Sequence, residues 1–216
     1  MIEANDFLKE FFIDLQGALG ILLKDSYQGI DIGKLRVVAS VDAAYRGDLM
    51  SVAAVEWDLE KGPLSETVFT CKPPYPYVPG LLFLREGPPM LHAVKQLGNN
   101  WQLLLVDAHG LLHPRRMGLA VFLGFLLNKP AVGIAKSLLV GLERSGAVFG
   151  EVEVDGEVLG YWFKFGRSKK FYASPGYLVK VQQIPEIIKK LGNTYPEALR
   201  FVDRRSKEIL RKKSDQ

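Results

Sequence analysis

The sequence contains only one cysteine, Cys71, and three histidines among its 216 residues. A single cysteine excludes an internal disulfide and any zinc cluster built on cysteine ligands. No run of about 18 apolar residues is present, so a membrane-spanning helix is not expected. The first 16 residues carry four acidic side chains, which argues against a signal or transit peptide. Together, these absences predict a cytoplasmic chain.

The sequence also lacks low-complexity tracts, internal repeats and linker-like segments. Its length and its 48% hydrophobic content suit one large soluble domain, which we predict over residues 1–216. Residues 161–216 hold 14 Lys and Arg against 5 Asp and Glu, whereas residues 1–160 hold 14 against 19. This basic region, with a helix and tail over residues 200–216, favours a polyanionic partner. A solvated helix with a charged tail would have the same composition.

Hydrophobic periodicity and turn residues predict both helices and strands. Helices are expected over residues 4–24, 80–98, 114–130 (with Pro114 at its start) and most of 184–213. Strands are expected over residues 35–45, 101–110 and 131–136, with two more in 50–74 separated by KGP. A hairpin around Asp155-Gly156 is expected in 148–166, and a strand or loop in 169–181. This order predicts a mixed sheet with helices on its faces.

Three acidic residues stand at unexpected places in this pattern. Asp42 lies within the apolar run VVASVDAA, Asp107 ends the run LLLVD, and Glu86 stands near the start of a predicted helix. A carboxylate buried without a partner costs several kcal/mol. Each acid therefore either caps a loop, meets an arginine or serves a ligand. Open sheets bind ligands at their strand ends, which favours the third interpretation for the set.

Clustered carboxylates repel one another and need cations. Oxygen ligands alone favour Mg²⁺ or Mn²⁺ over zinc, and a pair of such ions stabilises the attacking and leaving oxygens of a phosphodiester. Basic side chains follow the acids closely, namely His109, His113, Arg115, Arg116 and Lys136. Lys136 ends an apolar strand and needs an anionic partner there. Either histidine could equally be an ordinary packing residue.

The segment PYPYVPG, residues 74–80, encloses Tyr77 among prolines. Proline fixes φ and biases the preceding residue toward extended geometry, so this loop is stiff before it meets any ligand. Arg85 and Glu86 follow at once on an apolar segment. The alternative for Tyr77 is that it packs on the core.

Four segments resemble, in order, the motifs of the endonuclease V family: VDAAY at 41–45, PYVPGLLFLRE at 76–86, VDAHGLLHPRRMGLA at 106–120 and GIAKSLL at 133–139. The resemblance covers about residues 35–205 and suggests an archaeal or bacterial member. It implies an α/β fold with a ribonuclease H-like mixed sheet flanked by helices. It also implies a DNA repair endonuclease that recognises deoxyinosine and flips the base. Such an enzyme hydrolyses the second phosphodiester bond 3′ to the lesion, leaving 5′-phosphate and 3′-hydroxyl ends.

The resemblance places the catalytic residues at Asp42, Glu86, Asp107, His113 and Lys136. It makes the three acids metal ligands, with Asp203 as a fourth, and implies Mg²⁺ as the cofactor with Mn²⁺ as a substitute. The alternative for Asp203 is a solvent-facing acid that pairs with Lys207 along its helix. His113 and Lys136 match the family's histidine and lysine that contact the scissile phosphate and neutralise its charge.

Recognition of the nucleic acid is implied at three further sets of residues. A wedge that enters the duplex beside the lesion falls on Pro76, Tyr77, Val78 and Pro79, where prolines remove backbone freedom before binding. The pocket for the flipped base, in which small residues let the main chain approach the purine, falls on Gly80, Leu82, Gly110, Gly118, Gly133 and Ala135. Contacts to the DNA backbone are expected from Arg85, Arg115, Arg116, Arg204 and Arg205.

Two residues depart from the family's pattern. Ala108 stands where glycine is usual and Tyr177 where histidine is common, which bears on the rate and the range of damaged bases. Two other functions stay open: a ribonuclease that cuts inosine-containing RNA, and a catalytically silent inosine binder. The silent binder is disfavoured because the chain retains the catalytic set Asp42, Glu86, Asp107, His113 and Lys136. The expected partner is duplex or single-stranded DNA containing deoxyinosine, bound by a monomer without membrane contact.

Overall fold

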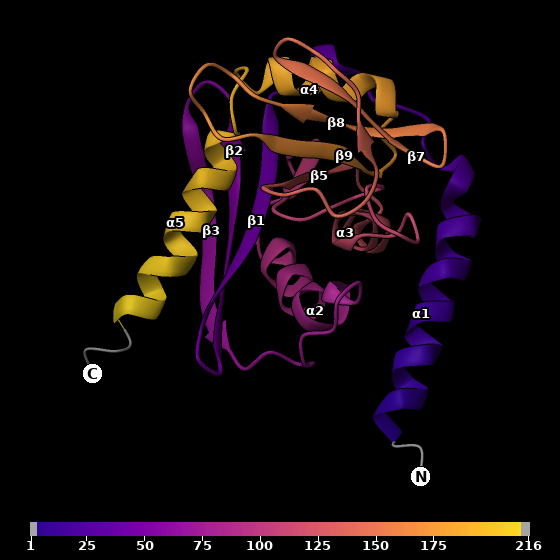
Figure 1. Cartoon of the computed structure of the whole chain (residues 1–216). Helices are drawn as coiled ribbons and strands as arrows, with labels where there is room; N and C mark the ends of the chain where they lie inside the picture. The colour runs from indigo at the N-terminus through magenta and orange to yellow at the C-terminus, as the bar shows by residue number, and fades with distance from the viewer. Residues whose placement is uncertain (1–3, 213–216) are drawn as a thin grey trace.

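The computed structural model describes residues 4–212, in which a nine-stranded sheet carries helices on both faces (Figure 1). The strands are β1 Val37–Arg46, β2 Leu49–Asp58, β3 Gly62–Cys71, β4 Leu103–Val106, β5 Ala131–Ala135, β6 Leu142–Glu143, β7 Phe149–Val154, β8 Glu157–Phe163 and β9 Phe171–Tyr177. The α-helices are α1 Ala4–Leu22, α2 Leu82–Lys95, α3 Leu119–Leu127, α4 Ile184–Lys190 and α5 Glu197–Lys212. Residues 213–216 of the predicted basic tail lie outside the described part of the chain.

The strand order is β3-β2-β1-β4-β5-β9-β8-β7-β6. β1, β2 and β3 are antiparallel neighbours, β1, β4 and β5 run parallel, and β9 returns antiparallel to β5. Val106 of β4 pairs with Val41 of β1 and with Gly133 of β5, so β4 and β5 end beside the middle of the longer β1. We call this end of the sheet the carboxyl edge. The predicted ribonuclease H-like mixed sheet flanked by helices is confirmed.

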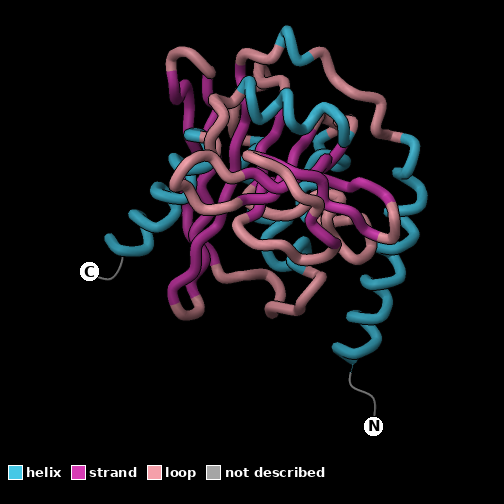
Figure 2. The backbone as a smooth tube through the Cα atoms, turned by 45° about the horizontal axis from the view of Figure 1, so that its top comes forward, coloured by secondary structure: helices cyan, strands magenta, loops and turns pink. Residues whose placement is uncertain are grey.

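Alternation of side chains along the strands divides the core between the two faces of the sheet. Leu103 and Leu105 pack with residues of α4 and α5, whereas Leu104 and Val106 pack with residues of α2 and α3. Figure 2 shows the magenta strands with cyan helices on either side. Because both faces are buried, the central strands read as continuous apolar runs in the sequence.

Most predicted elements are present, including the hairpin at Asp155-Gly156, whose two turn residues both have positive φ. Residues 169–181, predicted as strand or loop, contain β9. The two-residue strand β6 was not predicted, since so short a segment carries no periodicity.

The predicted start of the third helix at Pro114 is wrong. α3 begins at Leu119, and residues 114–118 form a loop in which Arg116 has φ 52. Close packing requires this loop, because a Cβ on Gly118 would lie 2.2 Å from the carbonyl oxygen of His109. The strand predicted through residue 110 likewise ends at Val106.

The N-terminal helix α1 is the predicted amphipathic helix, but the body covers only part of its apolar surface. Phe12 packs edge-on against Tyr75 and Phe83, with ring centroids 6.4 and 6.3 Å away. Phe7 and Phe11 are 56% and 60% exposed where the helix extends along the side of the molecule (Figure 1). Within residues 4–212, no helix is long and apolar enough to cross a bilayer.

Candidate active site

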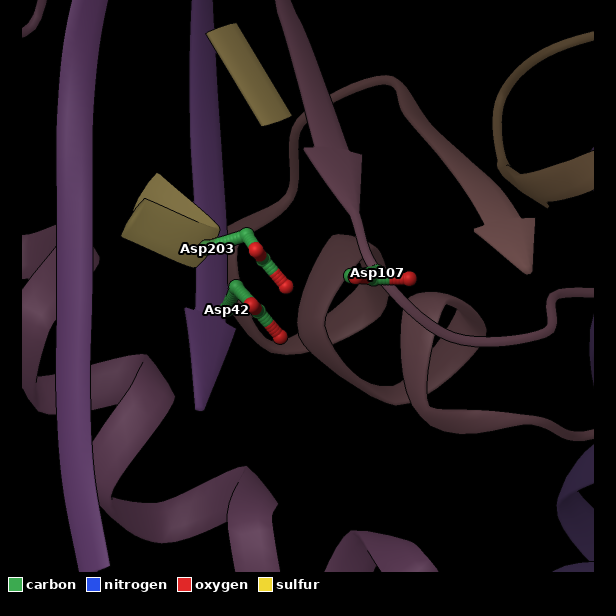
Figure 3. A group of neighbouring side chains, drawn as sticks. All are labelled: Asp42, Asp107 and Asp203. Carbon is green, nitrogen blue, oxygen red and sulfur yellow. The ribbon is translucent and has the colours of Figure 1, made fainter. Parts of the chain in front are cut away.

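Three aspartates converge beside the carboxyl edge (Figure 3). Asp42 comes from β1, Asp107 directly follows β4, and Asp203 lies on α5. One carboxylate oxygen of each lies within 4.8 Å of the others. The strand period of two explains the convergence, because Asp42 and Asp107 continue the alternating positions, such as Val38 and Leu105, that face α4 and α5. The sequence prediction that Asp203 joins Asp42 and Asp107 agrees with this arrangement.

Lys136 follows β5 and reaches the same group. Its Nζ donates to Asp107 Oδ2 at 2.5 Å and to Asp203 Oδ1 at 3.2 Å, so the anionic partner expected for Lys136 is present. Partial burial lowers the pKa of Lys136, but the hydrogen bond and charge of Asp107 outweigh this and raise it overall. Lys207 donates to both carboxylate oxygens of Asp203 at 2.7 Å, so the expected pairing along the helix is present at a residue that also joins the group of aspartates.

The lysines near the three aspartates do not fully balance the negative charge of the carboxylates. Asp42 is buried, and burial together with the neighbouring charge of Asp107 raises its pKa well above the ordinary value. Its carboxylate accepts a hydrogen bond from the backbone N–H of Ala43 at 2.7 Å. Burial also acts to raise the pKa of Asp203, but its bonds from Lys207 and Lys136 lower it. The environment at Asp42 therefore favours either a proton or a further cation.

Glu86 approaches this group from the opposite face of the sheet, on α2. It is 8% exposed, and its Oε1 accepts a hydrogen bond from the Tyr45 hydroxyl at 2.9 Å. Burial raises the pKa of Glu86 to about 7; the bond from Tyr45 opposes this shift and the charge of Asp107 adds to it. Glu86 is therefore an electrostatic neighbour of Asp107 but stands outside the group of oxygens within 4.8 Å.

A cavity of about 310 Å³ opens next to Asp107 and Lys136. Of the residues predicted to form the base pocket, Gly80, Leu82, Gly118 and Ala135 line it. Gly110 and Gly133 are not among its lining residues: a Cβ on Gly110 would meet the Pro175 carbonyl oxygen at 2.0 Å, and one on Gly133 the Ala108 carbonyl oxygen at 2.4 Å. The first four residues are thus placed to touch a ligand, and the last two to let backbone segments approach each other.

Tyr77 stands at this cavity with 66% of its surface exposed, so the alternative of a core position is wrong. The loop that carries Tyr77 is held in place by contacts at Gly80, a residue with φ 79. The Gly80 carbonyl oxygen accepts hydrogen bonds from Arg115 Nη2 at 2.9 Å and from His113 Nε2 at 3.2 Å. Arg115 Nε in turn donates to Gln16 Oε1 at 2.6 Å. This chain of contacts, which we call the Gly80 clamp, connects α1 to the tyrosine loop.

The Gly80 clamp also defines the tautomer of His113. The backbone N–H of Arg115 donates to His113 Nδ1 at 3.2 Å, so the proton resides on Nε2, which faces the Gly80 carbonyl. Burial, reinforced by the charge of Arg115, lowers the pKa of His113 to about 4, and burial likewise lowers that of His109 to about 4. Both imidazoles line the cavity and are neutral near pH 7. His113 is therefore a hydrogen-bond donor rather than a cation.

Sequence reasoning missed Gln16 and Tyr45. Gln16 is 1% exposed and also donates to the Met117 carbonyl oxygen at 2.6 Å. Its position was detectable, because a glutamine at helical spacing between Phe12 and Leu19 interrupts an apolar face. Tyr45 had no such signal, since its contact with Glu86 depends on how α2 crosses β1.

The five arginines predicted to contact DNA all have protein partners. Arg85 donates to the Tyr75 carbonyl oxygen, Arg115 to Gln16 and Gly80, Arg116 to Glu157, Arg204 lies 3.7 Å from Glu208, and Arg205 makes a two-pronged contact with Glu66. Ion pairs with Glu66 and Glu208 raise the pKa of Arg205. Recruitment of Arg205 by a phosphate would have to break these contacts.

The two departures from the family's pattern occupy different surroundings. Ala108 is buried and lines the cavity, so its methyl group occupies space that a glycine would leave open there. Tyr177 lies in β9 and packs edge-on against Phe125 of α3, with ring centroids 6.0 Å apart. It is not among the cavity-lining residues.

The sequence and the fold are similar to known proteins. The Endonuclease V family model matches residues 22–204. An endonuclease V of Desulfurococcus amylolyticus is 39% identical over 168 residues, 77% of each chain, and one of Saccharolobus islandicus is 36% identical over 97% of this chain and 98% of its own. Ciona intestinalis endonuclease V, solved in complex with a 24mer DNA containing an inosine followed by a ribo-adenosine, superposes with a TM-score of 0.85. It is 23% identical and covers 96% of this chain and 99% of its own.

Proposed function

Because this chain belongs to the endonuclease V family, we propose that it is a Mg²⁺-dependent endonuclease that recognises deoxyinosine in DNA. It would hydrolyse the second phosphodiester bond 3′ to the lesion and leave 5′-phosphate and 3′-hydroxyl ends. We further propose that residues 1–216 form one domain and act as a monomer. The observation that carries the proposal is the convergence of Asp42, Asp107 and Asp203 beside a cavity bordered by an exposed tyrosine.

The residues at the carboxyl edge fit a hard divalent cation. Asp42, Asp107 and Asp203 offer oxygen ligands only, the donor type that Mg²⁺ and Mn²⁺ prefer. Burial leaves Asp42 in need of positive charge that Lys136 does not fully supply. These three residues would hold the ion, which when bound supplies Lewis-acid stabilisation of the charge on the phosphate. Glu86 would ionise when positive charge is bound beside Asp107.

Other side chains would act on the substrate directly. Lys136 stays protonated and would place its ammonium against an oxygen of the scissile phosphate, where fixed charge stabilises the transition state. His113 is neutral and carries its only ring proton on Nε2, so it would donate to a phosphate oxygen in place of the Gly80 carbonyl oxygen that this proton faces without substrate. These assignments keep the catalytic roles of both residues and give His113 a definite protonation state.

Base recognition would use the cavity and the tyrosine loop. Unstacking a base costs a few kcal/mol, less for a weakened pair such as hypoxanthine with thymine. Tyr77 is exposed and would fill the space that the flipped base leaves in the stack. Pro76, Val78 and Pro79 flank it in the sequence and would complete the wedge. Backbone groups near Gly80 and Gly118 would read the O6 acceptor and N1–H donor of hypoxanthine, which adenine lacks. Inosine in the complex of the Ciona intestinalis protein supports this choice of base.

The direct test is cleavage of matched oligonucleotides with Mg²⁺. Single-stranded DNA, duplex DNA and RNA, each with one inosine or with adenosine at that position, are incubated with the protein, and the cut and its ends are mapped. A cut at the second phosphodiester 3′ to deoxyinosine, absent from the adenosine controls and prevented by chelation, is the expected result. Faster cleavage of the RNA would assign the ribonuclease function instead, and inosine binding without cleavage would assign the silent binder.

Two variants tie the activity to the proposed site. Asp107→Asn keeps the shape of the side chain but removes its charge, so cleavage should fall by about 10³-fold or more while inosine DNA remains bound. Asp155→Asn is the matched control: this exposed acid sits in the β7–β8 turn with φ 53, a conformation that asparagine tolerates. Near-parent cleavage by Asp107→Asn would refute the site.

A further inference from the structure

The connection between β8 and β9, residues 164–170 with the sequence KFGRSKK, carries four cations and no acid. Lys164, Arg167 and Lys169 are exposed, and each lacks an ion pair or hydrogen-bonded side-chain partner within residues 4–212. Lys170 differs, because it donates to Glu143 at 2.5 Å. We call residues 164–170 the basic loop. Its three unpaired cations contrast with Arg204 and Arg205 on α5, which pair with glutamates.

The basic loop has a defined shape rather than a loose one. The backbone N–H of Phe165 donates to Ser168 Oγ at 3.1 Å, and the N–H of Ser168 donates to the Phe165 carbonyl oxygen at 3.0 Å. The N–H of Lys164 donates to the Val148 carbonyl oxygen at 2.8 Å. Phe165 packs into the core face shared with α4 and α5. These contacts hold the cations on a fixed turn.

The fold places this turn beside the active site. Ala135 pairs with Tyr172, so Lys136 stands level with Phe171, where the basic loop ends. A row of side chains makes the connection: Lys136 Nζ lies 5.6 Å from the Tyr195 ring, the Tyr195 ring 5.5 Å from Phe171, and Phe171 6.3 Å from Phe165. A strand advances about 3.4 Å per phosphate, so the loop is within a few nucleotides of the aspartates.

The two faces of the sheet give the direction of the strand. The cavity is lined by residues of α2 and α3, whereas the aspartates and the basic loop lie toward α4 and α5. A strand whose lesion occupies the cavity and whose scissile phosphate lies at the aspartates passes from the first face to the second, the face on which the basic loop lies level with Lys136. This direction rests on the proposed function, which cuts on the 3′ side of the lesion.

We propose that Lys164, Arg167 and Lys169 form the phosphate-binding surface for the strand leaving the active site on the 3′ side of the cut. Three unpaired cations on a fixed turn match the regular negative charge of a nucleic-acid backbone. The contact is sequence-independent, since side chains that bind phosphate carry no base information. It replaces Arg204 and Arg205 as the principal backbone contact of the basic C-terminal region.

The test measures how DNA affinity depends on salt, using an undamaged single strand in the presence of a chelator so that no cleavage occurs. The triple variant Lys164→Gln, Arg167→Gln, Lys169→Gln should have a slope of log K against log salt that is shallower by up to about 2, and by more on a duplex. The control triple Lys180→Gln, Lys189→Gln, Lys190→Gln removes the same charge from exposed positions at the opposite end of β9 and on α4. Its slope should equal that of the parent chain.

Strand polarity is tested with inosine oligonucleotides truncated from either end. Shortening the 3′ side should weaken binding by the parent chain. The same truncation should weaken binding by the basic-loop variant only slightly. An unchanged slope, equal slopes in the two triple variants, or sensitivity to 5′ truncation alone would overturn the proposal. Because the slope is measured on undamaged DNA, its result is independent of whether the parent chain cuts at inosine. If the basic-loop variant has the expected shallower slope but the parent chain does not cut at inosine, the proposed function is rejected while the basic loop remains a phosphate-binding surface.

Discussion

Replacing Arg115 by methionine separates two roles that its sequence position allows. Sequence reasoning expects Arg115 to contact the DNA backbone, whereas the structure directs its guanidinium inward to Gln16 and the Gly80 carbonyl. Methionine keeps the unbranched length of the side chain and removes both donors. If Arg115 serves these inward contacts, Arg115→Met loosens the tyrosine loop and removes no contact between the protein and a DNA phosphate.

The expected magnitude follows from the contacts. A hydrogen bond to a charged group contributes about 1.5–3 kcal/mol, and the partial exposure of Arg115 favours the low end. Gln16 is 1% exposed, so water cannot easily replace the lost partner. A total of about 2 kcal/mol corresponds to a fall in Tm of roughly 4–8 °C for a chain of this length. Reordering one loop residue on binding costs a further 1–2 kcal/mol, which is about tenfold in affinity for an inosine duplex.

Three measurements decide the outcome: a thermal melt, the dissociation constant for an inosine duplex, and the salt dependence of binding to undamaged DNA. Arg116→Met is the matched control, because Arg116 is the adjacent arginine and pairs with Glu157 at the surface. Arg115→Met should lower Tm and duplex affinity but keep the salt slope. An unchanged Tm with a slope reduced by about 0.9 would show that Arg115 binds phosphate, and the Gly80 clamp would be wrong.

The remaining predictions concern Tyr77, Lys136 and Glu86. Tyr77→Ala should weaken inosine-duplex binding by about ten- to a hundredfold, since stacking on a base contributes roughly 1–3 kcal/mol; an equal loss on single strands with a lower Tm would contradict a wedge. Lys136→Met should reduce single-turnover cleavage about 10²-fold or more and lower Tm in chelator, a loss that Mg²⁺ should reverse; a Tm deficit unaffected by Mg²⁺ would argue against shared charge at the site. The pKa of Glu86 is raised from 4.5 to about 7, so the folded chain binds more protons than the unfolded chain between these values. In chelator, its contribution to the free energy of unfolding is therefore present below about pH 4.5 and is lost as pH rises through 7, by about 3 kcal/mol. Glu86→Gln should remove that component from the pH dependence of Tm, and identical profiles would refute it.

The sequence predicted the residues of the candidate site better than their arrangement. Asp42 and Asp107 were recognisable because a carboxylate in an apolar strand is costly without a purpose. The period of two along each strand then determined that both face α5. Glu86 carried the same kind of signal, but it reaches the site from the other face. The distance that separates it from the group of three depends on the crossing of α2 over β1, which has no local signature.

The arginines show the opposite case. Their positions on a basic helix and beside the histidines suggested DNA contacts, because net charge is visible in a sequence and pairing is not. Arg205 reaches Glu66, 139 positions away in the chain, and no local pattern forecasts such a partner. The basic loop was counted in the same basic region and was not singled out. Only the return of β9 beside β5 brings it level with Lys136.

The sequence by itself determined the alternating and helical segments, the stiff proline-framed tyrosine and the presence of acids at strand ends, because these depend on local backbone preference and on the cost of burying charge. The tertiary structure decided which of those charges are neutralised by protein and which stay available to a ligand. Charge balance at a site is set by distances of a few ångströms between elements that are remote in the chain. Packing of the two core faces fixes those distances, and with them the group formed by Asp42, Asp107 and Asp203.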